Sequence, residues 1–489
     1  MALDENQVTN FLDSTVQAAK TILETVKEDG LIHVFSHLDA DGVAAAGIIG
    51  KTLFRLDAKF RIRITQWIDE KIVGEITSEK PQLIIFTDFG SGYIDLLNEK
   101  LADFKIVILD HHQIIGKESA NVVHVNPHLH GIDGARDISG SGVAYFVAKA
   151  VDKDNIDLAP VAVVGALGDM QDKYDQRELG GVNEKIVEDA TNAGLLTVEK
   201  DLIFFGRETR PIHRTLASTT NPFIPGISGE EDKSLAFLAS LDIKPRHGEK
   251  WRALRDLSDE EKKKLCSALA DYLLSKGLRY EVTNLIGHVY ILNREEPWTP
   301  LRDAREFAVL LNATGRMDKP SLGVSICMGD RFSALEEANK VLEEYRRTIS
   351  KYLGWVMEKP ERMKELENIY VVYGENFIGD KIVGAISSIL STSLPNPEKP
   401  LIAYANVEEE GLAKFSARTI DTLTNKGVNL GEVMQVAAEK CQGKGGGHNV
   451  AAGAQVPIEK ISDFIEIVNE LVGKQLKGEH IGSRNNTGL

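Results

Sequence analysis

The sequence is poor in cysteine and has no long apolar run. Its three cysteines, Cys266, Cys327 and Cys441, lie far apart and form no CxxC pair, which excludes a zinc ribbon and a disulfide framework and favours a reducing cytoplasm. No uninterrupted apolar run reaches the ~18 residues of a membrane span, so we expect no membrane insertion. The first 30 residues mix acidic, basic and apolar side chains, unlike a signal or transit peptide.

Positive charge is also scarce. The 57 Lys and Arg are outnumbered by 73 Asp and Glu, for a net charge of −16. This balance argues against a protein held to nucleic acid mainly by bulk positive charge, but it allows an enzyme that meets phosphates through metal ions and a local basic groove. Hydrophobic residues make up 43% and charged residues 27% of the chain, as in folded globular proteins. Its 489 residues predict two to four domains.

Short apolar segments alternate with helical patterns through the first part of the chain. Strands are predicted at 31–35, 60–65, 83–87 and 106–109, and helices at 1–30, 43–53, 96–101, 141–151 and 158–167. This alternation favours an α/β fold with a mostly parallel sheet covered by helices on both faces. We place this first domain at residues 1–195.

The rest of the chain predicts two further parts and a tail. Residues 196–365 are expected to form a mostly helical α+β insert, with a long irregular connection at 206–232 that is rich in Pro, Gly, Ser and Thr. Within it, Ser258 and Glu261 have the spacing of a capping box at the start of a helix. Residues 366–477 predict a smaller α/β domain, and 478–489 a flexible polar tail.

Aspartate and histidine follow several of the apolar segments, namely at Asp39, Asp41, Asp88, Asp110, His111, His112 and Asp169. Open α/β sheets bind ligands outside the carboxyl ends of their strands, so these residues should converge. Crowded carboxylates repel one another, and a divalent cation is the simplest neutraliser. Carboxylates with one or two imidazoles suit Mn²⁺ or Mg²⁺ better than zinc, and two such ions can activate a water against a phosphate ester. For any single aspartate, a helix cap is the alternative.

These motifs resemble, in order, the four motifs of the DHH phosphoesterase superfamily: HLDADG at 37–42, the strand-end Asp88, DHH at 110–112 and GALGD at 165–169. The GGGH run at 445–448 resembles the signature of the associated DHHA1 domain. The resemblance implies a parallel-sheet DHH domain followed, after the insert, by a smaller α/β DHHA1 domain.

Other stretches are similar to the RecJ exonucleases within this superfamily, at 311–325 and 378–390. Residues 210–226 and the helical insert most resemble the archaeal RecJ-like nucleases that associate with the GINS replication complex. The implied activity is that of a metal-dependent single-strand exonuclease acting on DNA, RNA or both, in DNA replication or repair with GINS.

The resemblance implies a role for each motif residue. The metal ligands would be Asp39, Asp41, Asp88, His111 and Asp169, with Asp88 bridging two ions. His37 would be either a further ligand or only a neighbour. Asp110 would orient an imidazole, as expected beside a ligating histidine, and His112 would contact the scissile phosphate or protonate the leaving group.

Substrate contacts are implied in the C-terminal part, at Ser416, Arg418, Gly446, Gly447 and His448, with Arg316 as a further candidate. Glycines let backbone N–H groups approach an anion closely, although a glycine run on its own is equally typical of a flexible loop. A guanidinium pairs two phosphate oxygens at once, which suits Arg418, whereas for Arg316 a salt bridge at a helix end is the alternative.

Two other functions are consistent with the same motifs. A small-substrate phosphodiesterase, cleaving nanoRNA or cyclic dinucleotides, is disfavoured by the long segment between the two domains. A replication scaffold with an inactive nuclease is disfavoured because every motif carboxylate is present.

Several weaker patterns each have two interpretations. The N-terminus of the helix after Ser139 could hold a phosphate or simply be capped by that serine. The connection at 207–229 could dock a replication partner or form a lid over the cleft. Histidine and tryptophan side chains could face the substrate or be structural, at His124, His128, His130, Trp251, Trp298 and Trp355.

Overall fold

The computed structural model describes residues 4–117, 119–219, 222–391, 394, 396, 398–479 and 481. It divides into two compact units, Met1–Leu342 and Glu343–Leu489, and helix α14 (Ser333–Glu358) contains the boundary. Among the described residues, no helix is both long and apolar enough to cross a membrane. The domain boundaries at 195 and 365 stay predictions, and most of the predicted tail 478–489 lies outside the described residues.

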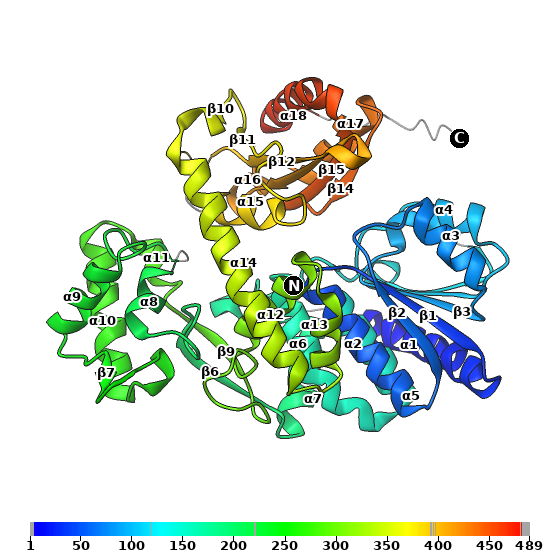
Figure 1. Ribbon diagram of the computed structural model, residues 1–489, viewed down its shortest axis with the longest axis horizontal. Helices are drawn as coiled ribbons and strands as arrows, with labels where there is room; N and C mark the ends of the chain where they lie inside the picture. Colours follow the sequence, from blue (N-terminus) through cyan, green and yellow to red (C-terminus); the bar gives the residue numbers. More distant parts are fainter. Residues whose placement is uncertain are drawn as a thin grey trace. The chain divides into compact units, whose positions relative to one another are not determined.

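A five-stranded parallel sheet, in the order β2-β1-β3-β4-β5, forms the core of the first unit (Figure 1). Its strands are β1 (Leu31–Ser36), β2 (Lys59–Ile64), β3 (Leu83–Thr87), β4 (Ile106–Leu109) and β5 (Val122–Val125). The predicted α/β fold is confirmed. Strand β5 was missed because it is four residues long and His124 interrupts its apolar run. The strand order reverses between β1 and β3, where such sheets form a crevice at their carboxyl edge.

Helices cover both faces of this sheet. Helices α3 (Glu70–Glu79) and α4 (Ile94–Lys100) pack on one face, against side chains that include Phe35 and Phe86. Helices α1 (Glu5–Lys27), α2 (Ala40–Arg55) and α5 (Gly140–Val151) lie on the other face (Figure 1). Helix α6 (Ala159–Gly168) packs behind α2 and α5, and α7 (Val182–Asn192) packs on α6. Helix α2 therefore runs from the carboxyl edge of β1 through the centre of the unit.

The remainder of the first unit contains a small, mostly helical module. Strand β6 (Leu196–Leu202) pairs antiparallel with β9 (Ile286–Leu292), and the module lies between them in the chain. Its elements are α8 (Ile212–Ala217), α9 (Glu231–Ser240), β7 (Arg246–His247), β8 (Lys250–Trp251), α10 (Asp259–Ser275) and α11 (Arg279–Val282). The capping box of Ser258 and Glu261 is confirmed at the start of α10. Helices α12 (Ala304–Arg316) and α13 (Pro320–Cys327) then return to pack on α2.

The prediction of a long irregular connection at 206–232 was wrong in part. The segment contains helix α8, and Ile224 and Ile227 are buried in the apolar core of the module. Proline and glycine set the turns of this segment, but turn residues do not prevent the apolar residues between them from packing inward. The segment is therefore a structural part of the module, and Phe223 is its exposed apolar side chain.

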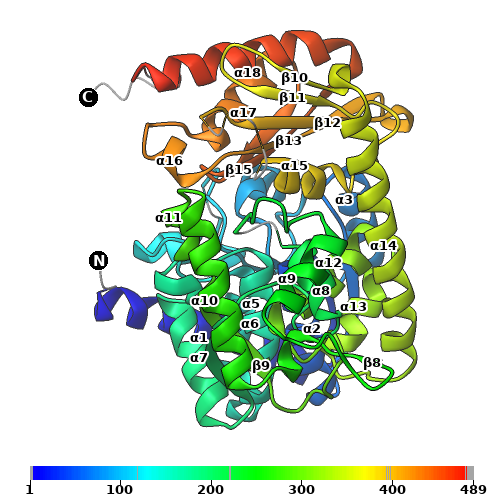
Figure 2. The same ribbon diagram turned by 90° about the vertical axis from the view of Figure 1, so that its left-hand side faces the viewer.

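The second unit is built on a six-stranded mixed sheet in the order β10-β11-β12-β13-β15-β14. The strands are β10 (Met363–Glu365), β11 (Tyr370–Tyr373), β12 (Leu401–Val407), β13 (Leu412–Arg418), β14 (Lys444–Gly447) and β15 (Ala451–Pro457). Helix α15 (Val383–Ser391) covers one face, and α17 (Leu430–Lys440) and α18 (Ile461–Leu476) cover the other (Figure 2). A short helix, α16 (Asp421–Thr424), follows β13.

The side chains of strand β13 alternate between the two faces of this sheet. Ala413, Phe415 and Ala417 belong to the apolar core that contains α17 and α18. Successive side chains of a strand point to opposite faces, so Ser416 and Arg418 lie on the α15 side. There Ser416 Oγ is 2.8 Å from Ser387 Oγ, and Arg418 Nε donates to Ser388 Oγ at 2.8 Å.

The burial of the 206–232 segment gives a first prediction. Ile224→Ala should lower the free energy of unfolding by about 2–5 kcal/mol, because it opens a cavity in the module core. Phe223→Ala, at the neighbouring exposed position, should change it by no more than about 0.5 kcal/mol. Urea denaturation followed by circular dichroism measures both. Equal effects of the two substitutions would contradict the packing described for this segment.

Candidate metal centre

Asp39 lies in the loop that connects β1 to α2, and it caps the helix. Its Oδ1 accepts the N–H of Gly42 at 3.1 Å, and its Oδ2 is 2.9 Å from His37 Nδ1. Burial by itself would raise the pKa of Asp39, but the charge and hydrogen bond of His37, the Gly42 N–H and the charge of Arg316 together hold it well below its ordinary value. Asp39 is thus both a helix cap and a member of a charged cluster.

Asp41 lies in the first turn of α2 and is buried. Its two oxygens accept the backbone N–H groups of Gly140 and Ser141 at 2.7 and 3.0 Å, at the N-terminus of α5. A helix N-terminus carries oriented N–H donors, and α5 supplies two of them to the Asp41 carboxylate. The suggestion that this helix end holds a substrate phosphate was therefore wrong. The alternative, a cap by Ser139, is confirmed by its bond from the Gly142 N–H.

Asp88 follows β3 directly and is the most poorly compensated carboxylate of the cluster. Its backbone has a positive φ of 62°, a conformation that Asp tolerates better than most residues. Neither of its buried oxygens accepts a hydrogen bond from the described residues. Burial, and then the charges of Asp41 and Asp39, raise the pKa of Asp88 well above its ordinary value.

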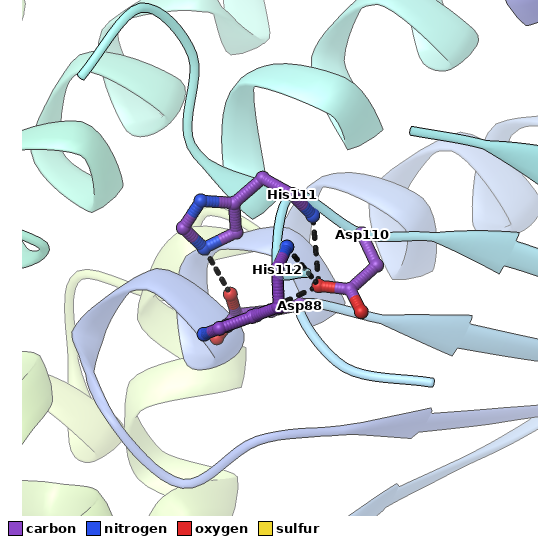
Figure 3. Close-up of side chains that lie close together, drawn as sticks. All are labelled: Asp88, Asp110, His111 and His112. Carbon is purple, nitrogen blue, oxygen red and sulfur yellow. Dashed lines mark hydrogen bonds and ion pairs between the residues drawn. The ribbon is translucent and has the colours of Figure 1, made fainter. Parts of the chain in front are cut away.

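His111 faces Asp88 across the ends of β3 and β4 (Figure 3). Its Nδ1 lies 2.7 Å from the carbonyl oxygen of Gly134, which can only accept, so Nδ1 carries the proton. Its Nε2 is 3.2 Å from Asp88 Oδ1, 3.8 Å from Asp41 Oδ2 and 3.9 Å from Asp169 Oδ2. Burial lowers the pKa of His111, but the surrounding carboxylates raise it on balance. A carbonyl on one ring nitrogen is the usual way to orient the other toward a metal.

Asp110 is buried and already holds several donors. Its oxygens accept from His112 Nδ1 at 2.8 Å and from the N–H of His111 at 2.7 Å (Figure 3). They also accept from the N–H of Ser91 at 2.9 Å. Burial would raise the pKa of Asp110, but the charges of His112 and His111 and these bonds hold it well below its ordinary value. Asp110 therefore orients His112, whose side chain is 38% exposed.

Asp169 comes to the cluster from the end of helix α6, which confirms the helix predicted at 158–167. Its Oδ2 accepts from Gln171 Nε2 at 2.9 Å. Ligand atoms of Asp41, His111 and Asp169 lie within 4.8 Å of one another, and so do those of His37, Asp39 and Asp88. All four sequence motifs thus meet at one place.

Helix α12 contacts the HLDADG motif at 37–42. The sequence did not predict this contact. The N–H of Ala40 donates to Asn312 Oδ1 at 3.1 Å. A Cβ at Gly315 would lie 1.7 Å from the carbonyl oxygen of Leu38, so α12 contacts this loop directly. The last residue of α12 is Arg316, whose charge lowers the pKa of Asp39. The similarity of 311–325 to RecJ was the one sequence signal for this contact.

The other proposed substrate contacts lie in the second unit, on neighbouring strands. Ser416 of β13 pairs with Gly453 of β15, which pairs with Gly446 of β14. The predicted GGGH loop is in fact a hairpin: Gly446 and Gly447 belong to strand β14, and the N–H of His448 donates to the carbonyl of Ala451 at 2.8 Å. No side chain of the described residues lies within 4 Å of where a Cβ of Gly446 would be, so its backbone is open on that side.

The isolated histidines and tryptophans are largely accounted for by contacts within the protein. His124 Nε2 lies 2.9 Å from Ser91 Oγ, and His130 packs edge-on against Phe11. Trp355 stacks on Phe377, with ring centroids 4.5 Å apart. These contacts favour the structural interpretation for the three side chains.

The donor set fits a hard divalent cation. Four aspartates and His111 present oxygens and one nitrogen in neighbouring groups, which Asp88 and His111 connect. The buried oxygens of Asp88 accept no hydrogen bond from the described residues. A cation would offset the burial and the repulsion that together raise the pKa of Asp88. Carboxylate-rich sets of this kind suit Mn²⁺ or Mg²⁺. The ligand role of each residue stays a prediction.

Comparison with known families matches three parts of the chain. Residues 31–167 match the N-terminal domain of the DHH family, 204–286 the DHH-CID domain and 368–474 the DHHA1 domain. The chain is 34% identical over 456 residues to the protein MJ0831 of Methanocaldococcus jannaschii, which covers 92% of this chain and 94% of that protein. This chain belongs to the DHH family. The resemblance seen in the sequence is confirmed, and with it a phosphoesterase fold of the nuclease or phosphodiesterase class.

Nucleases are among the relatives of this DHH protein. It is 28% identical over 180 residues to the single-stranded-DNA-specific exonuclease RecJ of Haemophilus influenzae, a match of 35% of this chain and 30% of that protein. RecJ of Thermus thermophilus, solved in complex with Mn²⁺, aligns with a TM-score of 0.58 at 16% identity, over 94% of this chain and 55% of that one. CDC45 of Entamoeba histolytica aligns with a TM-score of 0.63 at 12% identity, over 94% and 99%. These two structural matches show likeness of fold alone.

Because the buried oxygens of Asp88 accept no hydrogen bond from the described residues, a substitution of Asp88 should affect the metal-free protein and the Mn²⁺-bound protein in opposite directions. Asp88→Asn should raise the thermal midpoint of the metal-free protein, by about 2–4 °C for each kcal/mol of repulsion relieved. The same variant should lose the stabilisation that Mn²⁺ gives to the wild type. Differential scanning calorimetry with and without Mn²⁺ measures both effects. Asp103→Asn, on an exposed turn, is the matched control and should behave as the wild type.

The contact between α12 and the first motif gives a paired glycine test. Gly315→Ala should push the helix from the Leu38 loop, displace Asp39 and weaken both Mn²⁺ binding and hydrolysis. Gly74→Ala, in helix α3 with open space around it, should be neutral or stabilise by up to about 1 kcal/mol. Isothermal titration with Mn²⁺ distinguishes them. Unchanged affinity in Gly315→Ala would show that α12 does not position the motif.

Proposed function

We propose that this protein is a metal-dependent exonuclease of single-stranded DNA, RNA or both. The observation that supports this most is the cluster of Asp39, Asp41, Asp88, His111 and Asp169 at the carboxyl edge of the sheet, with His112 beside it. The partial match to a single-stranded-DNA-specific exonuclease and the RecJ-like fold support the same substrate class.

In this proposal Asp39, Asp41, Asp88, His111 and Asp169 would hold two Mn²⁺ or Mg²⁺ ions, and His37 would be a further ligand or only a neighbour. Such ions activate a water and stabilise the charge that develops on a phosphodiester. The protein residues supply the rest: Asp110 holds Nδ1 of His112, which leaves Nε2 to contact the phosphate or to protonate the leaving oxygen. Helix α5 holds Asp41 in place, since both oxygens of this carboxylate accept backbone N–H groups there.

The second unit, in this proposal, grips the strand. Arg418 is held by Ser388 and by the carbonyl of Ala417, so its guanidinium has a fixed position from which to meet a phosphate. Gly446 offers backbone that is open on one side, Gly447 follows it in the same strand, and Ser416 and His448 lie on the neighbouring strand and turn. Arg316 would contribute a further cation close to Asp39.

A replication role with a GINS-type partner is part of the proposal. It is supported by the sequence similarity to archaeal nucleases of that association and by the CDC45-like fold. The same likeness keeps a scaffold without nuclease activity as the second candidate. The complete carboxylate set favours the enzyme, since a scaffold has no need of a buried Asp88 whose oxygens accept no hydrogen bond from the described residues. Small-substrate phosphodiesterase activity is the remaining alternative.

The decisive experiment follows degradation of 5′- and 3′-labelled DNA and RNA strands with Mn²⁺ and with Mg²⁺. We expect stepwise shortening of single strands, little effect on duplexes, and loss of activity in Asp88→Asn. Cleavage of dinucleotides but not of longer strands would support the small-substrate alternative. Absence of any hydrolysis with metal bound would favour the scaffold.

Arg418→Ala should separate strand binding from chemistry. One lost phosphate contact should weaken binding of a long single strand and flatten the log–log salt dependence by roughly 0.7. Arg418→Lys should restore part of the binding, since it keeps the charge but loses the paired donors. Hydrolysis of bis-p-nitrophenyl phosphate should fall far less than strand cleavage. An equal loss of both activities would place Arg418 in the chemical site.

A further inference from the structure

Gln171 lies two residues after Asp169, and its side chain is fully buried beside the carboxylate cluster. Its Nε2 donates to Asp169 Oδ2 at 2.9 Å, to the carbonyl of Gly134 at 2.9 Å and to the carbonyl of Ile138 at 3.2 Å. Three acceptors thus share the two hydrogens of one amide group. Neither the motifs nor the resemblance drew attention to this residue.

The orientation of this amide is fixed from its other side. Oε1 of Gln171 accepts from Asn183 Nδ2 at 2.7 Å, and Asn183 is itself buried. Because the oxygen faces a donor and the nitrogen faces three acceptors, the amide cannot flip without losing its bonds. Gln171 therefore presents N–H groups, and only these, toward Asp169 and Gly134.

The carbonyl of Gly134 connects Gln171 to a second residue of the cluster. It accepts from His111 Nδ1 at 2.7 Å as well as from Gln171. A Cβ at Gly134 would lie 1.9 Å from the carbonyl oxygen of His111, so the two backbones are in direct contact and only glycine fits. The amide group of Gln171 therefore contacts the Asp169 carboxylate and also the Gly134 carbonyl that orients the His111 imidazole.

We propose that Gln171 is a positioning residue of the metal centre, which couples the geometry of Asp169 to that of His111. The inference rests on the proposed function, because it assumes that both residues bind the ion. The Gln171 amide approaches Asp169 Oδ2 much more closely than His111 Nε2 does, at 2.9 Å against 3.9 Å. Without Gln171 the Asp169 carboxylate would lose this short bond and would be freer to rotate. Outer hydrogen bonds of this kind typically carry a roughly 10–100-fold effect on metal affinity.

The experiment measures Mn²⁺ binding to the full chain by electron paramagnetic resonance and isothermal titration. Gln171→Met keeps the length of the side chain and removes its donors, and Gln171→Leu is a second variant in case the first does not fold. We expect about 10–100-fold weaker Mn²⁺ binding, with the secondary structure of the metal-free protein retained. Asn155→Leu removes another buried side-chain amide away from the cluster and should leave Mn²⁺ affinity unchanged.

A double-mutant cycle distinguishes positioning from a general structural role. In an Asp169→Asn background, Gln171→Met should weaken Mn²⁺ binding clearly less than it does in the wild type, because one of its two routes to the centre is already altered. Full additivity, or a Gln171→Met affinity equal to that of the wild type, would overturn the inference and leave the proposed function intact. A wild-type chain that binds no Mn²⁺ would overturn the proposed function and the inference together.

Discussion

The mutual repulsion of buried carboxylates at the carboxyl edge of the sheet is the constraint on which the rest of this structure depends. Ionised groups at such short range cannot all be removed from water without compensation. The protein compensates most of them singly. Asp41 receives two N–H groups of α5, Asp39 receives Gly42 and His37, and Asp110 receives His112 and Ser91.

Asp88 is the carboxylate that receives no such hydrogen bonds from the described residues. Its oxygens are buried, accept no hydrogen bond from the described residues, and face His111 and His37 at 3.2 and 3.8 Å. A carboxylate kept in this state costs stability in the metal-free protein, and its positive φ adds strain. Such costs are typical of functional sites, and a bound cation would recover them. The hydrogen-bonded carboxylates Asp39, Asp41 and Asp110 and the poorly compensated Asp88 thus belong to one arrangement that suits a bound cation.

The centre itself could be predicted from the sequence because its motifs are local. Asp39, Asp88 and His111 each follow an apolar strand, and parallel strands bring their carboxyl ends to one edge. What surrounds the centre could not be predicted in this way. Asn312 and Gly315 come from a helix far along the chain from the loop they brace, 272 residues away for the bond from Ala40 to Asn312. Contacts of that range leave no periodic signal in the sequence.

Amino-acid composition led to wrong predictions for two segments, 206–232 and the GGGH run at 445–448. Both have the composition of a loop, but one is packed into a core and the other is paired in a sheet. The 206–232 segment has the Pro, Gly and Ser content of a surface connection, yet Ile224 and Ile227 are core residues. The GGGH run was expected as a loop because glycine weakens strands, but pairing with β15 makes an edge strand of it. In both places long-range packing decided the structure, and local propensity described only the turns.

The two units divide the predicted residues by chemistry. The predicted acidic ligands and the imidazole of His111 belong to the first unit, where they form a cluster. The second unit offers hydroxyl, guanidinium and bare backbone groups on β13 and the β14–β15 hairpin, which suit a polyanion and not a cation. A net charge of −16 is then no obstacle to binding a nucleic acid. In the proposed function, the charges that contact the substrate would be local: a metal ion at the scissile phosphate, and a small number of oriented donors along the strand.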